Sequence, residues 1–143
     1  MKDVLGILKT SDFIEELPPG LKSSVTTLEK RGFTYEQIGL EMSKNPSFGL
    51  AAKGGDKWNE DLFSKIMDEL RIMLCTEDSK YAELRNKLSE EVNVSAKVIT
   101  ALISGWVGNT LGVAEAICVP FVILVVASIL RVGLSVFCGV KKE

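Results

Sequence analysis

The sequence contains no histidine among its 143 residues. Histidine is the commonest general base, the most frequent metal ligand, and the side chain that titrates near neutral pH. Serine and cysteine nucleophiles therefore have no imidazole to activate them, and no Ser–Lys or carboxylate-assisted arrangement has local support. We expect a non-enzymatic protein with no cofactor and no metal site.

Cysteine is also scarce, because the chain has only three, at positions 75, 118 and 138. If Cys118 and Cys138 share one helix, they lie about 30 Å apart along it, which is far beyond disulfide reach. All three stand in apolar surroundings, where a free cysteine behaves as a small buried hydrophobic residue. The opening residues MKDVLGILKT lack the long apolar run of a secretory signal. We therefore expect reduced, buried thiols and a cytoplasmic protein.

The chain lacks an excess of positive charge, with 17 Lys and Arg against 19 Asp and Glu and a net charge of −2. Proteins that bind nucleic acid usually carry a basic face that displaces counterions from phosphates. The charge is uneven: residues 1–93 hold 13 basic and 17 acidic side chains, whereas residues 94–143 hold four and two. This contrast predicts an amphipathic helical domain over 1–93 and a hydrophobic hairpin over 94–143, packed together as one unit.

No stretch of the sequence alternates polar and apolar residues for long enough to predict a sheet. The segment 121–126 is rich in β-branched residues and could form a buried strand by propensity alone. However, the apolar pattern continues far beyond strand length without turn signals. We predict an all-α fold, a compact multi-helix domain of six or seven helices.

Several helix boundaries in the first part of the chain are well marked. Thr34 and Gln37 form the T-x-x-Q pattern of a capping box. Gly32, just before them, is placed to end the preceding helix as its C′ residue. Further helices are expected to begin near Asp78 and Ser95. An amphipathic helix that ends before Asp78 has apolar residues at every fourth position; these are Trp58, Leu62, Ile66, Leu70 and Leu74.

The last third of the chain predicts a hydrophobic helical hairpin, with helices over 96–109 and 113–138 that meet at Gly112. In the second helix Ser128, Arg131 and Ser135 fall on one face. Arg131 within such an apolar helix needs an acidic partner, and the candidates are Glu90, Glu91 or Glu115 of another chain. The predicted interaction residues of the hairpin are Val98, Leu102, Trp106, Glu115, Phe121, Ser128, Arg131 and Ser135.

The uncharged length of this hairpin bears on whether it enters a membrane. The fifteen uncharged residues between Glu115 and Arg131 cover about 22 Å as a helix, less than the roughly 30 Å of a bilayer core. A longer span would place Arg131 inside, at a cost of about 2.5–3.5 kcal/mol at the bilayer centre. A single crossing with the C-terminus inside would require export of the acidic part, for which no signal is visible. The opposite orientation would turn the basic end outward, against the positive-inside tendency. We therefore favour burial against protein over membrane embedding.

Residues 21–53 also fit a helix-turn-helix pattern, in which a short third helix over 46–53 would read the DNA. The side chains that would contact the duplex are Tyr35, Lys44, Ser47 and Lys53. The third helix contains no arginine, and it offers little else for reading bases or binding phosphates. Three short helices that pack around a small core explain this segment better.

Three functions are consistent with these patterns. The first, which we favour, is a helical interaction protein whose hairpin mediates self-assembly or docks a partner protein. The second is a small membrane-associated effector or regulator that inserts the hairpin into a bilayer. The third is a helix-turn-helix regulator, although we do not expect nucleic acid as a partner.

Overall fold

The structure, a computed structural model, describes residues 8–44, 62–90 and 95–140. Its helices are α2 (Thr10–Ile14), α3 (Pro19–Lys30), α4 (Tyr35–Lys44), α5 (Leu62–Cys75), the short 3₁₀ helix η3 (Ser79–Tyr81), α6 (Ala82–Glu90), α7 (Ala96–Leu111), α8 (Glu115–Val132) and α9 (Leu134–Val140). These ranges contain no strand, so the predicted all-α fold is confirmed. The predicted helix over 46–53 and Trp58 lie outside the described residues.

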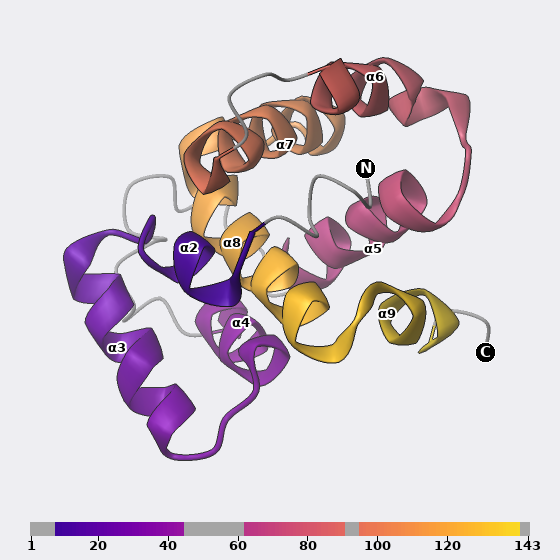
Figure 1. The fold of residues 1–143 in the computed structure, drawn as a ribbon. Helices are drawn as coiled ribbons and strands as arrows, with labels where there is room; N and C mark the ends of the chain where they lie inside the picture. Colours follow the sequence, from indigo (N-terminus) through magenta and orange to yellow (C-terminus); the bar gives the residue numbers. More distant parts are fainter. Residues whose placement is uncertain (1–7, 45–61, 91–94, 141–143) are drawn as a thin grey trace.

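Helix α8 runs through the middle of the molecule, with other helices around it (Figure 1). It contacts α2, α4, α5, α7 and α9. Every residue from 121 to 127 is at most 1% exposed, although consecutive residues of a helix point in all directions. The middle of α8 is therefore covered on all sides, as expected for a helix segment that is apolar all around.

The helices around α8 each turn an apolar stripe toward it. In α5 the predicted stripe is confirmed, because Leu62, Ile66 and Leu70 are at most 1% exposed. Phe63 of the same helix packs against Phe121 of α8, with ring centroids 6.1 Å apart and a tilted geometry that aromatic pairs favour. The solvent-facing positions of α5 are polar, so this helix is amphipathic as predicted.

The predicted helix boundaries around residue 33 are confirmed by backbone hydrogen bonds. The Thr34 N–H donates to Gln37 Oε1 at 2.8 Å, and the Gln37 N–H donates to Thr34 Oγ1 at 3.0 Å, which completes the capping box. Helix α3 ends with Gly32 at C′, and the Phe33 N–H donates back to the Leu28 carbonyl at 3.1 Å. The turn between α3 and α4 is therefore defined by local sequence.

The hairpin differs from the prediction in its second half, because α8 and α9 are separate helices. The prediction of one helix over 113–138 is wrong at Gly133, whose φ of 95° and ψ of 145° only glycine adopts readily. The Gly133 N–H still donates to the Ile129 carbonyl at 2.7 Å, so the break comes directly after a regular helical turn. No proline stands near this break, and a single glycine within an apolar segment is also compatible with close packing of helices.

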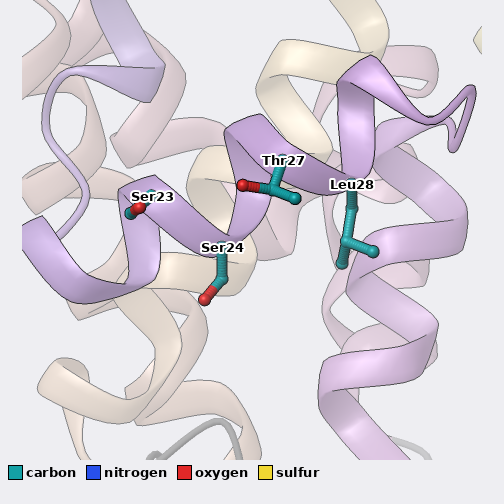
Figure 2. Close-up of a pocket in the computed structure, with 4 residues that line it drawn as sticks. All are labelled: Ser23, Ser24, Thr27 and Leu28. Carbon is teal, nitrogen blue, oxygen red and sulfur yellow. The ribbon is translucent and has the colours of Figure 1, made fainter.

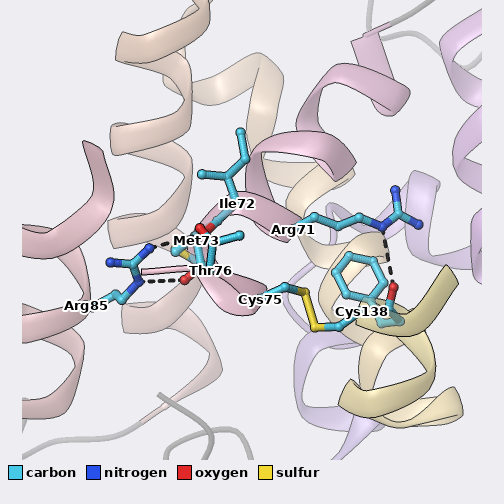
Figure 3. The surroundings of a disulfide bond; sticks show 8 residues. Arg71, Ile72, Met73, Cys75, Thr76, Arg85 and Cys138 are labelled. Carbon is cyan, nitrogen blue, oxygen red and sulfur yellow. Dashed lines mark hydrogen bonds between the residues drawn. A yellow bond between two sulfur atoms is a disulfide. The ribbon is translucent and has the colours of Figure 1, made fainter. Parts of the chain in front are cut away.

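The prediction of three reduced thiols is also wrong. Cys75 and Cys138 form a disulfide with their Cα atoms 5.6 Å apart, and Cys118 is a free, buried cysteine (Figure 3). The predicted separation of about 30 Å applied only to Cys118 and Cys138 on one continuous helix, and it did not concern Cys75. The break at Gly133 lets α9 pack against α5, and Cys138 thereby reaches the last residue of that helix.

Gly39 of α4 marks a close approach between α4 and α5. A methyl group at this position would lie 2.2 Å from a ring carbon of Phe63, which is fully buried. Alanine is the better helix former by about 1 kcal/mol, but severe overpacking of a core costs about 3 kcal/mol. We expect Gly39→Ala to lower the free energy of unfolding by about 2 kcal/mol, measured by chemical denaturation.

The matched control for this variant is Gly20→Ala. Gly20 also lies within a helix, α3, but a methyl group there would meet nothing within 4 Å. This variant should leave stability unchanged or raise it by a few tenths of a kcal/mol. Equal stabilities of the two variants would contradict the packing of α4 on α5.

Candidate functional site

A pocket of about 230 Å³ lies where the end of α8 meets the turn between α3 and α4. We call it the Arg131 pocket. Its lining residues come from the last turn of α3, the connecting turn, the start of α4 and the end of α8; they are Glu29, Gly32, Phe33, Thr34, Tyr35, Ser128, Arg131 and Val132. The turn at Gly32 and the capping box thus form one wall of the pocket, and the end of α8 forms the other.

Arg131 is held in this pocket by two partners on other helices. Its Nη2 donates to Glu29 Oε2 and, at 3.3 Å, to the Tyr35 hydroxyl. The guanidinium carbon also lies 4.9 Å from the centroid of the Tyr35 ring, within cation–π range. Both hydrogen bonds come from one nitrogen, whereas a guanidinium has five N–H donors. Among the described residues, Glu29 and Tyr35 are its hydrogen-bond acceptors, and the Arg131 side chain is 54% exposed, so other donors face outward toward a bound group.

The surroundings of Tyr35 raise the pKa of its hydroxyl to about 12, compared with a usual value near 10. Burial is the largest cause, followed by the hydrogen bond and the charge of Glu29, while the Arg131 charge opposes the shift. The hydrogen bond to Glu29 is also the main reason that the pKa of Arg131 rises. The guanidinium therefore stays charged in the pocket.

The rim of the pocket combines apolar surface with positive charge. Phe33 is 40% exposed and Val132 is 46% exposed, and both are large apolar side chains. Lys30 and Arg31 are exposed and flank the pocket residues Glu29 and Gly32 in sequence. Arg131 lines the pocket itself, and Glu36 is exposed directly after the lining residue Tyr35. The lining residues and their neighbours in sequence therefore hold three cations and two carboxylates.

The structure brings only part of the predicted interaction set to this pocket. Ser128 and Arg131 line it. Ser135 lies on α9 and does not share their face, because the break at Gly133 separates it from α8. Phe121 is 0% exposed in the core, and Glu115 is exposed at the opposite end of α8.

The remaining predicted interaction residues are on α7, away from the pocket. Val98, Leu102 and Trp106 are half-buried there. The Lys87 ammonium of α6 lies 6.0 Å from the Trp106 ring centroid, at the edge of cation–π range. Leu102 and Trp106 pack against the core of the same chain.

The acidic partner of Arg131 is not the one predicted. The candidates were Glu90, Glu91 or Glu115 of another chain, whereas the structure pairs Arg131 with Glu29 of the same chain. The two residues are 102 positions apart, and no sequence pattern links them. Glu29 was therefore missed.

The residues proposed for DNA contact do not form one surface in the described part of the chain. Tyr35 is 4% exposed and lies beneath the Arg131 guanidinium, so its ring is not presented to a duplex. Lys44 is exposed at the end of α4. Ser47 and Lys53 lie outside the described residues.

A second hollow, of about 300 Å³, lies along α3 (Figure 2). Its lining includes Ser23, Ser24, Thr27 and Leu28. These exposed hydroxyl groups have no histidine to activate them, since the chain has none. Within the described ranges, no three Cys, Asp or Glu side chains gather where they could hold a metal ion.

No protein-family model matches this chain, and neither a curated protein nor a solved structure matches it. Function is therefore inferred from the geometry of the chain itself. Among the described surfaces, the Arg131 pocket combines a hollow, a partly satisfied charge and exposed apolar side chains.

The raised pKa of Tyr35 generates a prediction for alkaline titration. The folded state holds the phenol proton more tightly than the unfolded state, so stability should fall as the pH rises from 10 toward 12. In a Tyr81→Phe background, ultraviolet absorbance should show no phenolate near pH 10 in the folded protein. Glu29→Gln should shift the phenolate transition to lower pH, because it removes the charge that raises this pKa. A folded-state transition near pH 10 would contradict the burial of Tyr35.

Proposed function

We propose that this chain is a non-enzymatic helical interaction protein that docks a partner protein at the Arg131 pocket. The observation that supports the proposal is the juxtaposition of Phe33 and Val132, both exposed, with a guanidinium that retains free donors. Aromatic and arginine side chains next to a hollow are the features that concentrate binding energy in protein interfaces.

The charge of the rim indicates the chemistry of the partner. Among the lining residues and their neighbours in sequence, the cations Lys30, Arg31 and Arg131 outnumber two acids, so the surface favours an acidic segment. A partner carboxylate can accept hydrogen bonds from the open edge of Arg131, and an adjacent apolar side chain can cover Phe33 and Val132. Glu29 and Tyr35 already hold the guanidinium in place, which reduces the entropy lost when the partner binds.

The apolar length of the hairpin has a different role in this proposal from the one expected. Residues 121–127 are enclosed by the chain's own helices, so they need no second protein to bury them. What the hairpin offers to a partner is the end of α8, at Ser128, Arg131 and Val132. Docking would therefore leave the core of the protein unchanged.

Membrane insertion is a second candidate, and one observation favours it. Among the described helices, α8 is long and apolar enough to cross a bilayer, with a mean hydropathy of 2.3 over its 18 residues. More than half of those residues are buried inside the protein, so insertion would require the surrounding helices to move away. Flotation with liposomes distinguishes the two functions. If the protein floats with the liposomes and α8 is protected from added protease, insertion is favoured over docking.

The docking proposal predicts the outcome of a peptide selection. Peptides selected on the immobilised chain from a random display library should carry Asp or Glu beside an aliphatic or aromatic residue. Arg131→Gln should weaken their binding by about 10–100-fold, the loss expected for charged hydrogen bonds of about 1.5–3 kcal/mol. Fluorescence anisotropy with a labelled selected peptide measures the change.

Lys22→Gln is the matched control. Lys22 is also a partly exposed cation paired with a carboxylate, Glu15 at 2.9 Å, but it does not line the Arg131 pocket. Both variants should fold normally, since exposed ion pairs contribute about 0–1 kcal/mol. Selected peptides without acidic residues, or equal affinity for the two variants, would refute docking at this pocket.

A further inference from the structure

The disulfide between Cys75 and Cys138 joins the last residue of α5 to the short helix α9 (Figure 3). Helix α9 has seven residues. Isolated helices shorter than about 12 residues are marginally stable in water. The free-energy cost of forming the first turn exceeds what the few later hydrogen bonds contribute. The position of α9 therefore depends on what holds it to the rest of the chain.

The other contacts that hold α9 are few in the described structure. Phe137 is its buried core residue, at 5% exposure, and Leu134 packs against the core while partly exposed. The Arg71 guanidinium of α5 lies over the Phe137 ring, with its carbon 4.7 Å from the centroid. Arg71 Nε also donates to the Phe137 carbonyl at 3.4 Å, which is a long hydrogen bond. Gly133 connects α9 to α8, and its positive φ of 95° is a backbone conformation that favours glycine.

We propose that the Cys75–Cys138 disulfide is a reducible latch that holds α9 against α5. A dithiol reductant breaks the bond by thiol–disulfide exchange: two electrons and two protons pass to the cysteine pair, and the reductant forms its own disulfide. Helix α9 then moves about Gly133, and Phe137 becomes exposed. This inference goes beyond the docking function and does not rest on it.

Two observations distinguish a latch from a bond that stabilises the whole fold. The core around α8 is built from α2, α4, α5 and α7, and among the described core residues only Phe137 belongs to α9. Both bonded cysteines are half-buried, so a small reductant can reach them. Cys118 is a free thiol that is fully buried, so it does not attack the disulfide in place of the reductant.

Hydrogen exchange with mass spectrometry on the full chain tests the latch, with dithiothreitol as the reductant. In the oxidised protein, a peptide covering 134–140 should be protected. After reduction its amides should exchange about tenfold faster or more, while a peptide covering 121–130 keeps its protection. Unchanged exchange over 134–140 after full reduction would overturn the proposal.

Two variants complete the experiment. Cys118→Ser retains the bonded pair and should respond to dithiothreitol as the wild type does. Cys75→Ser combined with Cys138→Ser should exchange rapidly over 134–140 without any reductant, and dithiothreitol should change nothing further. Loss of protection over 121–130 in this variant would also overturn the latch, because the disulfide would then stabilise the entire core.

Discussion

Helix α8 has no polar face to turn toward water, and the arrangement of the other helices follows from this. Each side chain from 121 to 127 is buried, and a fully buried aliphatic or aromatic side chain contributes about 1.5–3 kcal/mol of transfer free energy. That contribution is obtained only if α8 is covered on every side. Helices α2, α4, α5 and α7 provide this cover, each with one apolar stripe, and their polar faces form the surface.

The charged residues of α8 mark the limits of this buried segment. Glu115 stands in the first turn and Arg131 in the last turn, where each has the sign that the helix dipole favours. Arg131 thus lies where the core ends, and it reaches Glu29 on α3 and Tyr35 on α4. The same constraint that buries the middle of α8 therefore leaves a cation and apolar side chains together at its end, where we propose that a partner docks.

The features predicted correctly from the sequence depend on residues that are close together in the chain. The capping box at Thr34 and the stripe of α5 involve neighbours within one helix, so spacing alone reveals them. The features that were missed join distant segments: Cys75 with Cys138, and Arg131 with Glu29. Both depend on how helices pack, and the first also depends on the break at Gly133. No fixed spacing in the sequence marks two residues that meet only when distant helices pack, so these pairs could not be predicted.

The burial of α8 within its own chain is the central claim, and the free thiol of Cys118 reports on it. This thiol is 0% exposed, and burial, aided by the charge of Glu115, raises its pKa to about 11. The decisive measurement is alkylation with iodoacetamide in detergent-free, non-reducing buffer, followed by intact mass. If α8 is buried within its own chain, the native protein takes up no label, and Cys118 takes up one label after unfolding in denaturant. Stoichiometric labelling of Cys118 in the native protein would contradict it.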